Sequence, residues 1–145
     1  MRTSAGRLPD GSQSIAIPVA EDQSAEAGAG AELTGLLREE ARRRGLGLVS
    51  GAARLKARIR QVDARPRAVA LAAGRFRARE QEVTIKVDFE LKLKDGRNLP
   101  FSLSERASYL SASDLRNTLA NRHLALRQAL ERVAQSAIER ISRDF

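Results

Sequence analysis

The segment from Glu82 to Lys94 alternates strictly between apolar and polar residues. Every second position from Val83 to Leu93 is apolar, and most positions between them are charged. Because successive side chains of a strand point to opposite faces of a sheet, this period of two predicts a long β-strand with one buried face. Residues 95–98 (Asp-Gly-Arg-Asn) favour a tight turn. The alternation resumes from Leu99 to Tyr109, interrupted by Glu105, so we expect a β-hairpin whose apolar face needs a cover.

A strand with a basic face is predicted ahead of this hairpin. Leu55, Ala57 and Ile59 share one parity, and the positions around them are Arg54, Lys56, Arg58 and Arg60. Residues 64–74 contain Pro66 and small residues, and this segment is compatible with a longer strand, a bulge, or an irregular tip carrying Arg65 and Arg67. Beyond it, alternating arginines lead back into the hairpin: Arg75, Arg77 and Arg79.

Two segments carry apolar residues at helical spacing. The first helix should begin near Ala31, carry a stripe that includes Leu33 and Leu37, and end before Gly45 as the residue after the C-cap. The second should start at a cap supplied by Ser111 or Ser113. We expect its apolar stripe to run to the C-terminus through Leu115, Leu119, Leu126, Leu130, Val133, Ala137 and Ile141.

The remaining segments complete a predicted single domain over residues 14–145. Residues 1–13 read as a flexible lead-in, residues 14–19 and 46–49 as short strands, and residues 20–30 as a loop. The order is then β-α-β-β-β-β-α. It predicts an α+β fold: a two-layer sandwich with a mostly antiparallel sheet of four or five strands and two helices on one face.

The composition points to an anionic partner. The 145 residues include 26 Lys and Arg against 18 Asp and Glu, a net charge of +8. There is no cysteine, no apolar run long enough to span a bilayer, and no signal-peptide segment after Met1, so we expect a soluble chain as written. Met1 is also compatible with a start placed after a trimmed targeting segment.

We expect no enzymatic activity, cofactor or metal, since the sequence lacks the common nucleophile, phosphate-loop and metal-ligand motifs. His123, the one histidine, fits a structural place on a helix. The candidate binding site is the basic side of the predicted strands, although Asp88 and Glu90 interrupt it. Its members are Arg54, Lys56, Arg58, Arg60, Arg75, Arg77, Arg79, Lys86, Lys92 and Lys94. Phosphate suits them, while the few aromatic residues disfavour nucleic acid.

Several segments, in this order and spacing, resemble the LptE family of lipopolysaccharide-assembly lipoproteins. They are residues 14–19 (Ser-Ile-Ala-Ile-Pro-Val), 31–40 leading to 45–49, a strand ending near Val62, Gly74-Arg75, 83–92, Tyr109, and 121–126 (Asn-Arg-His-Leu-Ala-Leu). The resemblance covers residues 14–143.

The resemblance implies a small α/β plug, acylated on an N-terminal cysteine and held on the periplasmic side of the outer membrane. It also implies one-to-one insertion into the lumen of the LptD β-barrel, assistance in barrel assembly, and lipopolysaccharide binding through basic residues. This sequence departs from the family by lacking the signal peptide and the lipid-bearing cysteine. Two other readings stay open: a double-stranded RNA-binding domain, and another envelope lipoprotein that regulates a cell-wall synthase or a secretion pore.

Overall fold

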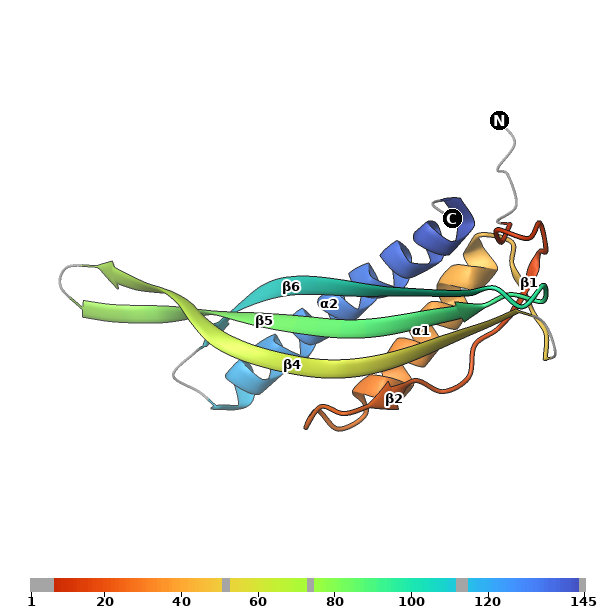
Figure 1. Cartoon of the computed structure of the whole chain (residues 1–145). Coiled ribbons are helices and arrows are strands. Elements are labelled where there is room, and N and C mark those ends of the chain that lie inside the picture. Colours follow the sequence, from red (N-terminus) through yellow and green to blue (C-terminus); the bar gives the residue numbers. More distant parts are fainter. Residues whose placement is uncertain (1–6, 51–52, 73–74, 112–114, 144–145) are drawn as a thin grey trace, which may run out of the picture.

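The computed structural model describes residues 7–50, 53–72, 75–111 and 115–143, and the side chains of residues 67–79 are not part of that description. Within these ranges the chain forms six strands and two helices (Figure 1). In chain order they are β1 (Ser14–Ala16), β2 (Glu21–Asp22), α1 (Ala29–Arg43), β3 (Gly47–Leu48), β4 (Ala53–Ala72), β5 (Arg75–Lys92), β6 (Asn98–Ser111) and α2 (Leu115–Arg143).

The strands form one mixed sheet in the order β3-β1-β4-β5-β6, with β2 paired to β4 as well. The long strands β4, β5 and β6 are antiparallel neighbours, whereas the short strands β1, β2 and β3 pair in parallel. Gly96, at a φ of 91°, closes the turn between β5 and β6, and its N–H donates to the carbonyl of Leu93. The mostly antiparallel sheet is confirmed.

Both helices lie on one side of the sheet, so the protein has the predicted two layers (Figure 1). The apolar positions of β5 from Val83 to Leu91 are at most 3% exposed, and Leu55 and Ile59 of β4 are fully buried beside them. The period of two therefore places these side chains under the helices, as predicted. At one end the β4–β5 hairpin runs past both helices.

The predicted apolar stripe of α2 is only partly buried. Residues from Ala125 to Ile141 supply it to the core, but Leu115 is 71% exposed and Leu119 is 56% exposed. These two leucines of the predicted stripe are not core residues, because the stripe begins almost three turns of helix before its first buried residue, Ala125. Residues 112–114, which include the predicted cap Ser113, lie outside the described residues, and Ser111 ends β6.

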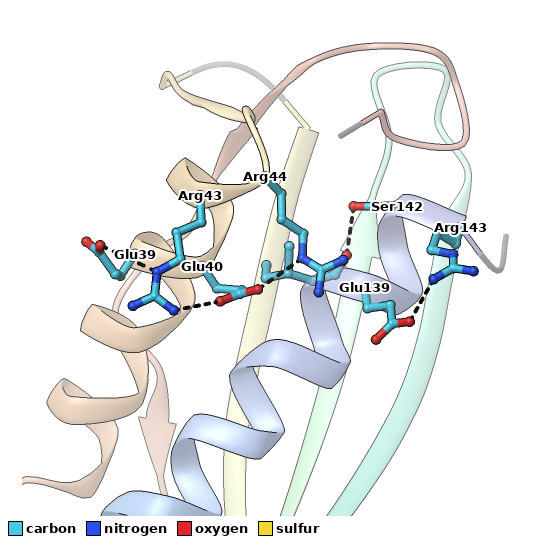
Figure 2. Close-up of polar contacts among 8 residues, drawn as sticks. Glu39, Glu40, Arg43, Arg44, Glu139, Ser142 and Arg143 are labelled. Atoms are coloured by element: carbon cyan, nitrogen blue, oxygen red, sulfur yellow. Dashed lines mark hydrogen bonds and ion pairs between the residues drawn. The ribbon is translucent and has the colours of Figure 1, made fainter. Parts of the chain in front are cut away.

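The helix α1 ends before Gly45, as predicted, and Gly45 follows the C-cap Arg44 with a φ of 78°. The N–H of Gly45 donates to the carbonyl of Arg42, and the N–H of Leu46 donates to that of Ala41, which is the Schellman pattern. Beside this cap, the buried Glu40 accepts from Nε of Arg44 at 3.0 Å. Figure 2 shows Glu40 and Arg44 near the end of α2, where Glu139 pairs with Arg143.

The loop before α1 is tied to α2 by charged contacts. Nη2 of Arg122 donates to Oε1 of Glu26, and this hydrogen bond, more than any other contact, raises the pKa of the Arg122 guanidinium. One turn into α1, Glu32 accepts from Nη1 of Arg127 at 2.8 Å. The first contact joins α2 to the loop that precedes α1, and the second joins the two helices directly.

Several boundaries differ from the sequence prediction. The first strand ends at Ala16, three residues early, and the predicted loop contains β2. The helix α1 begins at Ala29, and the ambiguous segment 64–72 continues β4 with register shifts near Pro66 and Ala70. Ahead of the predicted domain boundary, Leu8 is 3% exposed and belongs to the core cluster. The domain boundary itself stays a prediction.

Candidate functional site: a cationic groove on the open sheet face

The face of the sheet opposite the helices, called here the open face, carries most of the predicted basic residues. The exposed members on β4 are Arg54, Lys56, Arg58 and Arg60, and those on β5 are Lys86 and Lys92, with Lys94 exposed just beyond it. Antiparallel pairing brings the two strands together, with Arg54 opposite Lys92 and Arg58 opposite Asp88. Arg75, Arg77 and Arg79 belong to β5, but their side chains lie outside the description.

A groove of about 700 Å³ crosses this face. The four basic side chains of β4 line it together with Asp88 and Glu90 of β5. Its wall near the N-terminus is formed by Pro18, Val19 and Glu21, and the wall on β6 includes Pro100 and Ser102. Val19 is 68% exposed, so the groove places apolar surface beside its cations. This combination suits an amphiphilic anion.

Three of the cations have carboxylate partners. Nε of Arg58 lies 3.0 Å from Oε2 of Glu21, and Nε of Arg60 lies 3.3 Å from Oδ2 of Asp88. Nζ of Lys92 lies 3.8 Å from Oε1 of Glu90. These pairs compensate part of the basic charge, so the open face is less positive than its count of basic residues suggests.

The remaining cations differ in this respect. Over the ranges that the structure describes, Arg54, Lys56 and Lys86 form no ion pair. Arg54 and Lys56 lie next to each other on the open side of β4, two residues apart, and both line the groove. Arg54 and Lys56 are thus cations of the groove without an ion pair among the described residues, whereas Arg58 and Arg60 are paired with carboxylates. An anion gains most at cations whose charge no ion pair compensates.

Sequence reasoning found the cations but missed the groove wall. Pro18 and Val19 were read as part of a strand and Glu21 as part of a loop, yet all three line the groove. Their contact with β4 spans more than 30 residues of sequence, and the local pattern carries no signal for it. His123 lies exposed on α2, and in the described part of the chain no cluster of His, Asp or Glu side chains is arranged to hold a metal. Neither described helix has the length and hydropathy to span a bilayer.

Comparisons with solved structures place this fold among bacterial lipoproteins. The chain is similar to a minor lipoprotein from Acinetobacter baumannii (TM-score 0.61, 16% identity, 90% of each chain covered). It is also similar to an uncharacterized lipoprotein B from Nitrosomonas europaea (TM-score 0.55, 18% identity, 98% of this chain and 88% of that one). The rare lipoprotein B from Shewanella oneidensis has a TM-score of 0.50, at 22% identity over 88% of this chain and 89% of that chain. At these identities the likeness establishes the fold.

Sequence comparison establishes the family. No curated protein matches the sequence, but the family model described as "LptE: Lipopolysaccharide-assembly" matches residues 12–145. The match covers both helices, all six strands and every residue of the groove. This chain therefore belongs to the LptE family of lipopolysaccharide-assembly lipoproteins, which are not enzymes, and the resemblance noted in its sequence is confirmed.

Proposed function

We propose that this protein binds lipopolysaccharide in the cationic groove of the open face while it serves lipopolysaccharide assembly. The observation that carries the proposal is the pair Arg54 and Lys56, which share the groove, lack carboxylate partners among the described residues, and lie beside the exposed Val19. The family match supplies the ligand class.

The chemistry of the groove supports this ligand. Lipopolysaccharide carries phosphate groups and acidic sugars, and an arginine fork donates two parallel hydrogen bonds to such groups. Lys56 adds a compact positive charge two residues along the same strand. Pro18 and Val19 offer apolar contact to the sugar faces next to the phosphates.

We further propose that the protein sits as a one-to-one plug in the LptD β-barrel, on the periplasmic side of the outer membrane, and assists assembly of that barrel. Family membership supports this partner. The open face supports the location, because a long sheet with a charged, uncovered face is stable against the polar interior of a water-filled barrel.

Copurification tests the partner. The tagged protein is expressed in its native host, the envelope is solubilised in mild detergent, and the bound components are identified by mass spectrometry. The proposal expects a single large β-barrel protein in near-equal amount, with lipopolysaccharide. Recovery of RNA, a cell-wall synthase or a secretion pore in place of the barrel would contradict it.

A further inference from the structure

A short segment that pairs alongside β4 brings an acid into the groove. This segment, called here the strap, is Ile17–Asp22. It follows β1, contains β2, and leads toward α1. Within it, Glu21 pairs in register with Arg58, and Asp22 pairs with Ile59. The N–H of Gln23 then donates to the carbonyl of Ile59 at 2.9 Å. Glu21 is therefore placed beside Arg58 by backbone pairing as well as by charge.

The helix α1 fastens the strap from the core side. The hydroxyl of the buried Thr34 accepts from the N–H of Ala20 at 2.8 Å and donates to the carbonyl of Gly30 at 2.7 Å. The guanidinium of Arg38 donates to the carbonyl of Ile17 at 3.1 and 2.8 Å. A Cβ at Gly30 would lie 3.0 Å from the oxygen of Ala20, so the two segments approach closely. These contacts fix the backbone position of Glu21.

The ion pair between Arg58 and Glu21 can be exchanged for another anion. The side chain of Arg58 is 50% exposed and that of Glu21 is 66% exposed, so water already solvates both charges. Exposed pairs of this kind contribute little free energy, and a stronger anion can replace the carboxylate without a large penalty. Toward the other end of the groove, Arg54 and Lys56 form no ion pair among the described residues, and Glu90, which lies opposite Lys56 in register, pairs with Lys92 instead.

We propose that Glu21 determines how many anionic groups the groove accepts, by competing for Arg58. A first anionic group binds at Arg54 and Lys56, which form no ion pair that it would have to break. A second one must displace Glu21 from Arg58, which at the rise of an extended strand lies about 7 Å from Lys56 and about 14 Å from Arg54 along β4. The ligand class is an amphiphile with two separated phosphates, such as a diphosphorylated lipid A. This inference rests on the proposed lipopolysaccharide-binding function and names the residue that sets its selectivity.

The test compares monophosphoryl and diphosphoryl lipid A as ligands of the full chain. Glu21→Gln removes the competing charge and is expected to tighten binding of the diphosphoryl form by about two- to fivefold, the range of an exposed ion pair, while the monophosphoryl form changes little. The matched control is Glu39→Gln, which removes one acid of an exposed pair on α1, away from the groove. It should leave both affinities unchanged.

The same substitution in a protein without Arg58 distinguishes competition for Arg58 from a general repulsion between Glu21 and the anionic ligand. In an Arg58→Gln protein, Glu21→Gln should have no further effect, because the residue it competes for is gone. Equal tightening of both ligands, or tightening that persists without Arg58, would overturn the inference. So would unchanged binding in Glu21→Gln while Arg54 and Lys56 still determine affinity, a result that leaves the proposed function intact. If neither lipid binds the wild-type chain, the proposed function itself fails, and the inference fails with it.

Discussion

Arg60 of β4 and Asp88 of β5 face each other across the open face, with Nε of Arg60 3.3 Å from Oδ2 of Asp88. The hydroxyl of Ser102 on β6 donates to the other oxygen of the same carboxylate at 2.7 Å. Asp88 thus links all three long strands on the side that the helices leave uncovered. The Arg60 side chain remains 53% exposed, so the pair lies in a well-solvated environment.

Asp88→Asn is therefore expected to change the free energy of unfolding by less than about 1 kcal/mol, because exposed ion pairs are weak. Asparagine keeps an oxygen that can accept from Ser102. Urea unfolding followed by circular dichroism measures the change. A loss of more than about 2 kcal/mol would contradict the view that the contacts of Asp88 with Arg60 and Ser102 are weak.

A substitution in the buried part of α2 should, in contrast, lower the free energy of unfolding strongly. Leu130 is fully buried, and Leu130→Ala should destabilise the protein by about 2–5 kcal/mol through lost contacts and a residual cavity. Leu119 lies on the same helix but is 56% exposed, so Leu119→Ala makes the matched control and should change stability by less than about 0.5 kcal/mol. Equal losses in the two variants would show that the packed core extends to the start of α2.

Two glycines of α1 test how closely the strap packs on the helix. A Cβ at Gly30 meets the carbonyl oxygen of Ala20 at 3.0 Å, whereas nothing lies within 4 Å of one at Gly35. Gly30→Ala should cost about 1–3 kcal/mol by overpacking. Gly35→Ala should stabilise the helix by up to about 1 kcal/mol. Thermal unfolding of the two variants measures these changes. Stabilisation by both substitutions would contradict the close approach of Gly30 to the carbonyl of Ala20.

The acid dependence of stability is predicted from Asp10. The hydroxyl and N–H of Ser12 donate to its carboxylate and lower the pKa of Asp10 below its usual 3.8. A lowered pKa in the folded state stabilises the protein above the unfolded pKa, and this contribution disappears as pH falls through the folded pKa. The stability difference between wild type and Asp10→Asn should therefore shrink as pH drops below 3.8. A difference that widens in acid would refute the assignment.

Much of the fold could be predicted because local patterns determine it. The alternation from Val83 to Leu93 dictated which face of β5 is buried, and Gly45 and Gly96 marked a helix end and a turn where positive φ is required. The predictions failed where burial depends on distant elements. Leu119 has the right helical spacing for the core, but spacing does not reveal where the packed core ends.

The site was predictable only in part, for a similar reason. Arg54, Lys56, Arg58 and Arg60 follow from the parity of β4, and the structure exposes all four on the open face. The parity of β4 does not predict the ion-pair partners of these cations. Glu21, for example, reaches Arg58 through a parallel two-residue strand that no local pattern indicates. The sequence therefore shows which cations are present, while the structure distinguishes the compensated ones from Arg54 and Lys56.

The most direct test of the account is the affinity of the double variant Arg54→Gln/Lys56→Gln for lipopolysaccharide. The control is Arg42→Gln/Arg43→Gln, which removes the same charge from exposed positions on α1. Because each charged hydrogen bond contributes about 1.5–3 kcal/mol, the groove variant should bind more than about tenfold more weakly than the control, with an unchanged circular dichroism spectrum. Equal affinity in the two variants would contradict the claim that the open face binds lipopolysaccharide.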